Sequence, residues 1–147
     1  MSNEDIIKLT ESEKQLSGII YERLQDERSF ARIRSKGDTA LFGKTTGQMK
    51  ERLNIPQSRA LADFLPTITI KAKDFANEIT NFNIKRDNLL TEAKITREHV
   101  KNNQGVRKLL VKRNIKPEEL PPAEDIKKVE RRLTAEQRKL NKAEPVN

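Results

Sequence analysis

Residues 61–84 read LADFLPTITIKAKDFANEITNFNI, and this stretch decides the fold that the sequence predicts. Seven apolar side chains follow one another here at alternating steps of four and three, which places them on one stripe of a helix. They are Leu61, Leu65, Ile68, Ala72, Phe75, Ile79 and Phe82. Pro66 lies where a first-turn proline is tolerated, because the amide that it lacks would have no helical partner. The spacing predicts a core helix around which the other helices pack, with no chemistry of its own.

The composition of the 147-residue chain fits a helical protein. Charged residues make up 35% and aromatic residues only 4%, which suits helices with broad solvated faces. Glycine and proline are few, and the strict alternation typical of strands is scarce. We therefore expect an all-α fold: a small helical domain of about five to six helices with an extended C-terminal helix. The expected divisions are a helical core over residues 1–116, a proline-rich linker over 117–122, and a C-terminal helix with a disordered tail over 123–147.

Several function classes lack the residues that they need. The chain has no cysteine, which excludes disulfides, thiolate chemistry and cysteine-based zinc sites. No apolar run is long enough to span a membrane, and the N-terminus is unlike a signal peptide, so we expect a cytoplasmic protein. The single histidine, His99, has no second histidine for a metal site or relay and is expected at the surface or in a cap. No glycine-rich phosphate loop is present. We expect no enzymatic activity, no catalytic residue, no metal and no cofactor.

The net charge of +8 is distributed in blocks. Residues 28–59 and 97–116 each carry +6, residues 1–27 carry −4, and the remaining segments are neutral. Clustered positive charge attracts a phosphate backbone or an acidic protein face. The candidate phosphate contacts are Arg32, Arg34, Lys36, Lys44, Lys50, Arg52 and Arg59 in the first block, and Arg107, Lys108, Lys112 and Arg113 in the second. We expect both blocks to join on one side of the helix at 61–82; the alternative for each block is a solvated helix face.

Local signals predict how the chain is divided into helices. Ser29 begins a short helix that Gly37 ends, because glycine adopts the left-handed conformation at helix ends, and residues 37–44 then form a loop. A helix of about 18 residues is expected from Thr96. The last helix is expected to break and restart at Thr134, which is spaced with Gln137 as a capping box.

Residues 46–65, TGQMKERLNIPQSRALADFL, resemble a helix-turn-helix. Gln57, Ser58 and Arg59 would then open the second helix, where base-contacting side chains lie in that motif. A plain packing corner is the favoured alternative, since short helix pairs are common. In either case the small core of this corner is expected to comprise Met49, Leu53, Ile55, Leu61 and Phe64.

Four collinear phrases carry a resemblance to a known family. They are RIRSKGDTALFG (32–43), KTTGQMKERLNIP (44–56), SRALADFLPTITIKAKDFANEITNFNI (58–84) and EHVKNNQGVRKLLVKRNIKPEELPPAEDIKKVERRL (98–133). They resemble the C-terminal half of the DNA-damage-inducible protein D (DinD) family, in the versions found in Bacteroidetes-type bacteria. The resemblance implies a protein regulated by the DNA-damage (SOS) response, linked to the recombinase that coats single-stranded DNA. It supplies no catalytic residues. Family members carry an upstream Bro-like domain associated with DNA binding, which this sequence lacks; it is either a separated half or a free-standing short relative.

Two functions follow from these observations. The first is a module that binds DNA, including single strands, or a recombinase filament, through the two basic blocks; the scarcity of aromatic residues weighs against stacking on single-stranded bases. The second is a purely protein-binding module, a homo-oligomer or a phage or mobile-element regulator that inhibits a host protein, built on the heptads at 61–82 and 126–140. Phosphate binding should weaken steeply with salt, whereas burial of an apolar stripe should respond little.

Overall fold

The computed structural model describes residues 3–123 and 125–143, and over these ranges the fold is all-α, as the sequence predicts. The described elements, in chain order, are α1 (Asn3–Leu24), α2 (Ser29–Phe42), α3 (Thr46–Arg52), the one-turn 3₁₀ helix η1 (Leu61–Phe64), α4 (Thr67–Arg86), α5 (Glu92–Lys112), the 3₁₀ turn η2 (Pro117–Glu119) and α6 (Ile126–Ala143).

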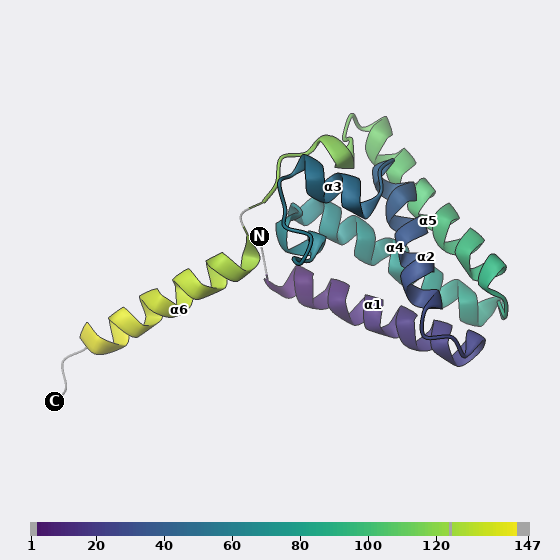
Figure 1. Cartoon of the computed structure of the whole chain (residues 1–147), viewed down its shortest axis with the longest axis horizontal. Coiled ribbons are helices and arrows are strands. Elements are labelled where there is room, and N and C mark those ends of the chain that lie inside the picture. The colour runs from purple at the N-terminus through teal and green to yellow at the C-terminus, as the bar shows by residue number, and fades with distance from the viewer. Residues whose placement is uncertain (1–2, 124, 144–147) are drawn as a thin grey trace.

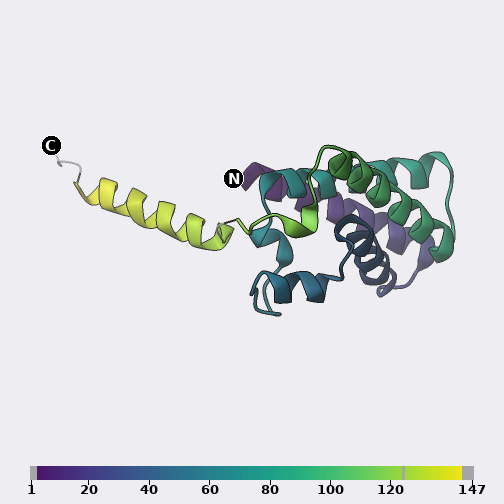
Figure 2. The ribbon, with the colours of Figure 1, turned by 90° about the horizontal axis from the view of Figure 1, so that it is seen from above.

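Helix α4 lies between α1 and α5, and α2 packs on α5 and α1 from one side of this layer (Figure 1). Two groups of side chains form the core. One joins α2, α3, η1 and the first half of α4 around Phe42, Met49 and Ile70, and the other joins the opposite ends of the helices around Ile20 and Ile84. Helix α6 projects away from this body in both perpendicular views (Figures 1 and 2). The extended C-terminal helix is therefore present.

The predicted apolar stripe does not form the buried face of one helix. Leu61 and Leu65 are buried before Pro66, and α4 begins directly after this proline. The side chains of Ile68, Phe75 and Phe82, however, are 42%, 58% and 64% exposed. The buried face of α4 is instead made mainly of small and polar residues, together with two isoleucines. They are Thr69, Ile70, Ala72, Lys73, Ala76, Asn77, Thr80, Asn81 and Ile84.

Polar pairing explains this reversal. Asn77 donates to the Ser12 hydroxyl at 3.1 Å, and Asn81 donates to the Ser12 carbonyl oxygen at 3.2 Å, so that both amide nitrogens of α4 are hydrogen-bonded to α1. Buried amide donors are tolerated when they have such partners. Periodicity of apolar residues alone therefore pointed to the wrong face of α4.

Gly37 does not end a helix, because α2 continues through it to Phe42 and ends at Gly43, whose φ of 67° is left-handed. The predicted loop at 37–44 is wrong, and Leu41 and Phe42, within that range, are buried at the end of α2. Gly37 is needed for a close approach: a Cβ at this position would lie 2.4 Å from Cδ2 of His99 on α5. The hydrogen atom that replaces a side chain here allows α2 and α5 to touch.

The helix-turn-helix prediction is also wrong, because the second element is only the single 3₁₀ turn η1. Without a second helix, Gln57, Ser58 and Arg59 have no recognition helix to open. The packing-corner alternative fits: Met49, Ile55 and Leu61 are buried, with Leu53 and Phe64 partly buried against them. Thr45 begins α3 through a complete capping box with Gln48.

Three further expectations fail at the C-terminal helices. Helix α5 starts at Glu92. Its cap, Thr91, lies five residues before the predicted cap at Thr96. His99 is buried, not at the surface. Helix α6 runs through Thr134 without a break. The tail at 144–147, expected to be disordered, lies outside the described residues.

Candidate nucleic-acid interface

A buried polar cluster joins α2, α4 and α5 beneath the surface. Thr80 donates to the Ala76 carbonyl oxygen at 3.0 Å, so the 2.7 Å contact between Thr80 and His99 is donated by Nδ1 of His99. Nε2 of His99 then accepts from Asn103 at 3.4 Å. Burial lowers the pKa of His99 to about 4, with the charge of Lys73 acting in the same direction. His99 is therefore a neutral packing residue at pH 7.

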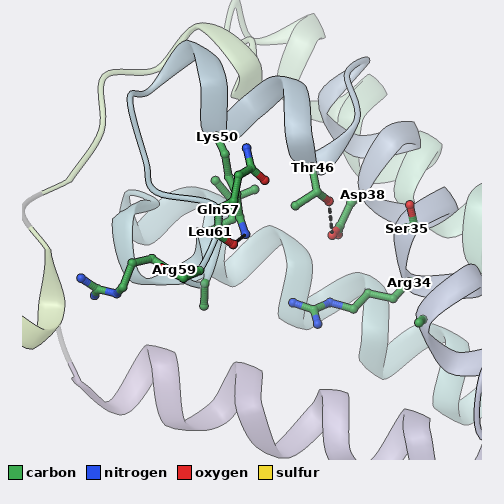
Figure 3. A pocket seen from close by; sticks show the side chains of 11 residues that line it. Arg34, Ser35, Asp38, Thr46, Lys50, Gln57, Arg59 and Leu61 are labelled. Carbon is green, nitrogen blue, oxygen red and sulfur yellow. Dashed lines mark hydrogen bonds between the residues drawn. The ribbon is translucent and has the colours of Figure 1, made fainter.

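A buried ion pair lies beside this cluster. Nζ of Lys73 is 3.0 Å from a carboxylate oxygen of Asp38, and both side chains are less than 10% exposed. The hydroxyl of Thr46 donates to the other Asp38 oxygen at 3.5 Å (Figure 3). Asp38 thus ties α2 to α4 and to the start of α3.

Three candidate residues of the first block line one surface hollow of about 490 Å³ between α2, α3 and residues 57–61 (Figure 3). They are Arg34, Lys50 and Arg59. Lys50 donates to the Gln57 carbonyl oxygen at 3.0 Å, and Arg34 lies 3.7 Å from a carboxylate oxygen of α1. These cations already have partners within the chain, which reduces what they can offer to a phosphate.

Arg59 is the most strongly engaged of the predicted contacts. Its two terminal nitrogens donate to the two oxygens of Asp125 at 2.7 Å each, and one also donates to Asp63 at 3.2 Å. Its guanidinium lies 5.1 Å from the centre of the Phe64 ring. The hydrogen bonds to Asp125 and Asp63 raise the pKa of Arg59 above its ordinary value. Arg59 holds the chain at the start of α6 rather than facing outward.

At the beginning of α2, Arg32 pairs with Asp26 at 2.8 Å and with Glu92 at 2.7 Å. The hydrogen bond with Glu92, followed by that with Asp26, raises the pKa of Arg32, and the pKa of each carboxyl is lowered. All three groups are substantially exposed, so the pairs contribute little to stability. Lys36, one turn further along α2, is exposed and makes no ion pair within the described part of the chain.

The two basic blocks meet at one place, a hollow of about 640 Å³ beside the C-terminal end of α2. Lys44 and Arg52 of the first block line it together with Arg107 of the second. Arg107 donates to Glu118 at 2.6 and 2.9 Å and to the Leu41 carbonyl oxygen at 2.9 Å. Its hydrogen bonds with Glu118 raise the pKa of Arg107 and lower that of the carboxyl. Among the described residues, this hollow joins part of the two blocks, with Glu118 and Glu119 also lining it, but no residue of α4 does, and Arg32 lies at the other end of α2.

Helix α5 carries a line of cations of which only Lys108 and Lys112 are among the predicted phosphate contacts. We call this line the α5 ridge: Lys94, Arg97, Lys101, Lys108 and Lys112. Steps of three, four, seven and four residues place it opposite the buried face formed by Ile95, His99, Asn103 and Val106. All five ridge side chains are exposed and make no ion pair among residues 3–123 and 125–143. Arg113, the C-cap residue of α5, is exposed but does not lie on the line of the ridge. The same periodicity test that was applied to apolar residues would have revealed it.

Metal-binding clusters and membrane-spanning helices are both absent from the described residues. Within the described ranges, no group of three or more histidine, cysteine, aspartate or glutamate side chains is placed to hold a metal ion. None of the helices in those ranges combines the length and the apolar character needed to cross a membrane.

Comparison with known proteins identifies the family. Neither the curated protein sequences nor the solved structures contain a match to this chain. A family model described as the DinD C-terminal domain matches residues 7–129, which is most of the sequence and includes every helix from α2 to α5 in full. This span contains all eleven predicted phosphate contacts and the whole α5 ridge. The match supports a role related to DNA damage, and the chain belongs to the DinD C-terminal domain family.

Proposed function

We propose that this chain is a non-enzymatic module of the DNA-damage response that binds nucleic acid, alone or coated by a recombinase, through the α5 ridge and the hollow beside it. The proposal places it in the cytoplasm. The observation that carries it is the ridge itself, five exposed cations along one face of α5 that make no ion pair with the described residues. Cations without internal partners are the ones whose full charge can neutralise phosphates.

The geometry favours the backbone of the nucleic acid over its bases. The ridge extends over nineteen residues of helix from Lys94 to Lys112, a rise of roughly 27 Å, which spans about eight phosphates of one strand at about 3.4 Å each. Lys44 and Arg52 extend the positive surface around the end of the helix. A phosphate-binding helix face positions the nucleic acid without reading its sequence.

Charge-matched variants test this proposal by fluorescence anisotropy on labelled single- and double-stranded DNA at several salt concentrations. Lys101→Ala, Lys108→Ala and Lys112→Ala are combined in a ridge variant. The control combines Lys14→Ala, Lys71→Ala and Lys85→Ala, three lysines that are also exposed but lie on α1 and α4. Both variants lose three positive charges, so they differ only in where those charges lay.

The ridge variant is expected to reduce the slope of log affinity against log salt by roughly two to three on duplex DNA, because each phosphate contact contributes about 0.9. The control is expected to keep nearly the wild-type slope. Equal loss in both variants would refute a defined interface, and absence of binding at low salt would refute nucleic-acid binding altogether. Repeating the titration with recombinase-coated single strands shows whether the coated form is preferred.

A second candidate function is protein binding, and one observation favours it. Phe75 and Phe82 are more than half exposed on α4, although the protein has only five phenylalanines. This surface lies on a different helix from the ridge, so the two functions are compatible.

A further inference from the structure

The outer face of α4 presents an apolar line to solvent. Ile68, Phe75 and Phe82 recur every seven residues on this helix, and their side chains are between 42% and 64% exposed. We call these three residues the α4 stripe. Leu109, on the adjacent helix α5, is 59% exposed. A continuous apolar face of this kind is typical of an interaction site.

Helix α1 places two carboxylates along one edge of the same face. Ser12 points toward α4, because Asn77 donates to its hydroxyl, whereas Glu13 points toward α2 and pairs with an arginine there. Glu11 lies on the opposite side of Ser12 from Glu13, and therefore on the side of the α4 stripe. Glu22 follows Glu11 by three helical turns, and both are exposed. Lys8, three residues before Glu11, is exposed on the same side and lines a hollow with Lys71 of α4, so a partner helix on the stripe would meet charges of both signs along this edge.

Helix α6 has the complementary pattern. Its sequence carries Ile126, Leu133 and Leu140 at the same seven-residue interval as the α4 stripe. Leu133 and Leu140 are 54% and 62% exposed. The helix contains seven basic and two acidic residues, a net charge of +5, so its cations can pair with Glu11 and Glu22 at the α1 edge.

The structure keeps α6 away from the stripe of its own chain. Asp125 is fixed to the body by two 2.7 Å hydrogen bonds from Arg59, and its carbonyl oxygen accepts from the amide of Lys128 at 3.0 Å in the first turn of α6. The direction of α6 is therefore set at Asp125, where the chain is fixed beside η1. From this point it extends away from α1, α4 and α5 (Figures 1 and 2).

We propose that α6 of one copy docks on the α4 stripe of a second copy, and that the exchange is reciprocal, giving a closed dimer. Matching seven-residue intervals allow the two apolar lines to pack along their length. Phe75 and Leu133 are the middle members of the two lines, so they meet whether the helices run parallel or antiparallel. Reciprocal exchange uses both stripes and leaves no open end for further assembly.

Light scattering after size-exclusion chromatography of the full chain, over a wide range of protein concentrations, is the first test. The wild-type chain is expected to have twice the monomer mass, and Phe75→Asp and Leu133→Asp are each expected to give the monomer mass. Leu90→Asp is the matched control, because Leu90 is similarly exposed at 54% but lies after α4, and it should remain dimeric. A monomeric wild type overturns the proposal, as does a dimer that survives Leu133→Asp.

The absence of cysteine from the sequence permits a direct test of contact. A chain carrying Phe75→Cys is mixed with a chain carrying Leu133→Cys and oxidised, and a covalent dimer of the two different chains is expected. Leu90→Cys mixed with Leu133→Cys should remain uncoupled. If the double variant Phe75→Cys and Leu133→Cys instead forms its disulfide within a monomer, α6 covers its own stripe and the proposal fails. No nucleic acid is present, so the result is independent of the proposed DNA binding.

Discussion

Replacing Gly37 by alanine tests the close approach of α2 and α5 on which the buried cluster depends. The new Cβ would lie 2.4 Å from Cδ2 and 2.6 Å from Nε2 of His99, and 3.0 Å from Nδ2 of Asn103. The imidazole cannot move away without stretching its 2.7 Å hydrogen bond with Thr80. Overpacking of a tight core costs about 1–3 kcal/mol, and an unmade buried hydrogen bond costs a similar amount.

Alanine also has an intrinsic advantage over glycine in a helix, of up to about 1 kcal/mol. The net loss in the free energy of unfolding is therefore expected to be about 2 kcal/mol. With a urea dependence of about 1–3 kcal/mol per molar, this loss lowers the unfolding midpoint by about 1 M. Circular dichroism in a urea titration measures the shift.

Two other helical glycines provide matched controls for this substitution. A Cβ on Gly18 or Gly105 would meet no neighbouring atom within 4 Å, so Gly18→Ala and Gly105→Ala should each stabilise the protein by about 0.5–1 kcal/mol. In a His99→Ala background, Gly37→Ala should lower the free energy of unfolding much less than it does in the wild type, because the imidazole ring that the new Cβ would strike is gone. A Gly37→Ala protein as stable as the wild type would refute the reasoning.

Three further predictions concern buried or anchored charges. The pKa of His99 is lowered to about 4 in the folded protein, so stability should fall by up to about 1.4 kcal/mol per pH unit as the pH drops from 6.5 to 4; urea titrations of wild type and His99→Gln would show this slope only in the former. Asp38→Ala should cost about 3–5 kcal/mol in a thermal melt by leaving the buried Lys73 ammonium unpaired, and adding Lys73→Met should restore much of the loss; an unchanged melting temperature in Asp38→Ala would contradict this. Arg59→Ala removes the anchor of Asp125 and should speed tryptic cleavage near the start of α6, whereas Arg86→Ala, which removes an exposed arginine from the end of α4, should leave that rate unchanged.

The sequence did not reveal which basic residues are already paired within the protein. It selected basic residues by their density along the chain, and this gave equal weight to Arg59 and Lys108. In the structure Arg59 binds two carboxylates, whereas Lys108 belongs to the unpaired α5 ridge. Linear density cannot distinguish these cases, because the carboxylate that neutralises a cation comes from a distant part of the chain; Asp125 lies 66 residues from Arg59.

The sequence by itself determined the all-α class, the start of a helix next to Pro66, and membership of the DinD C-terminal domain family. These features depend on local composition, helical period and collinear phrases, all of which are written in neighbouring residues. Only the tertiary structure decided that Gly37 lies inside a helix, that His99 is buried, and that Phe75 and Phe82 face outward. Each of these depends on a partner helix that is far away in the sequence. Hydrogen bonds from buried amides of α4 to α1, and the space that a glycine leaves for a histidine of α5, decide which helix faces are buried, and the spacing of apolar residues does not record either contact.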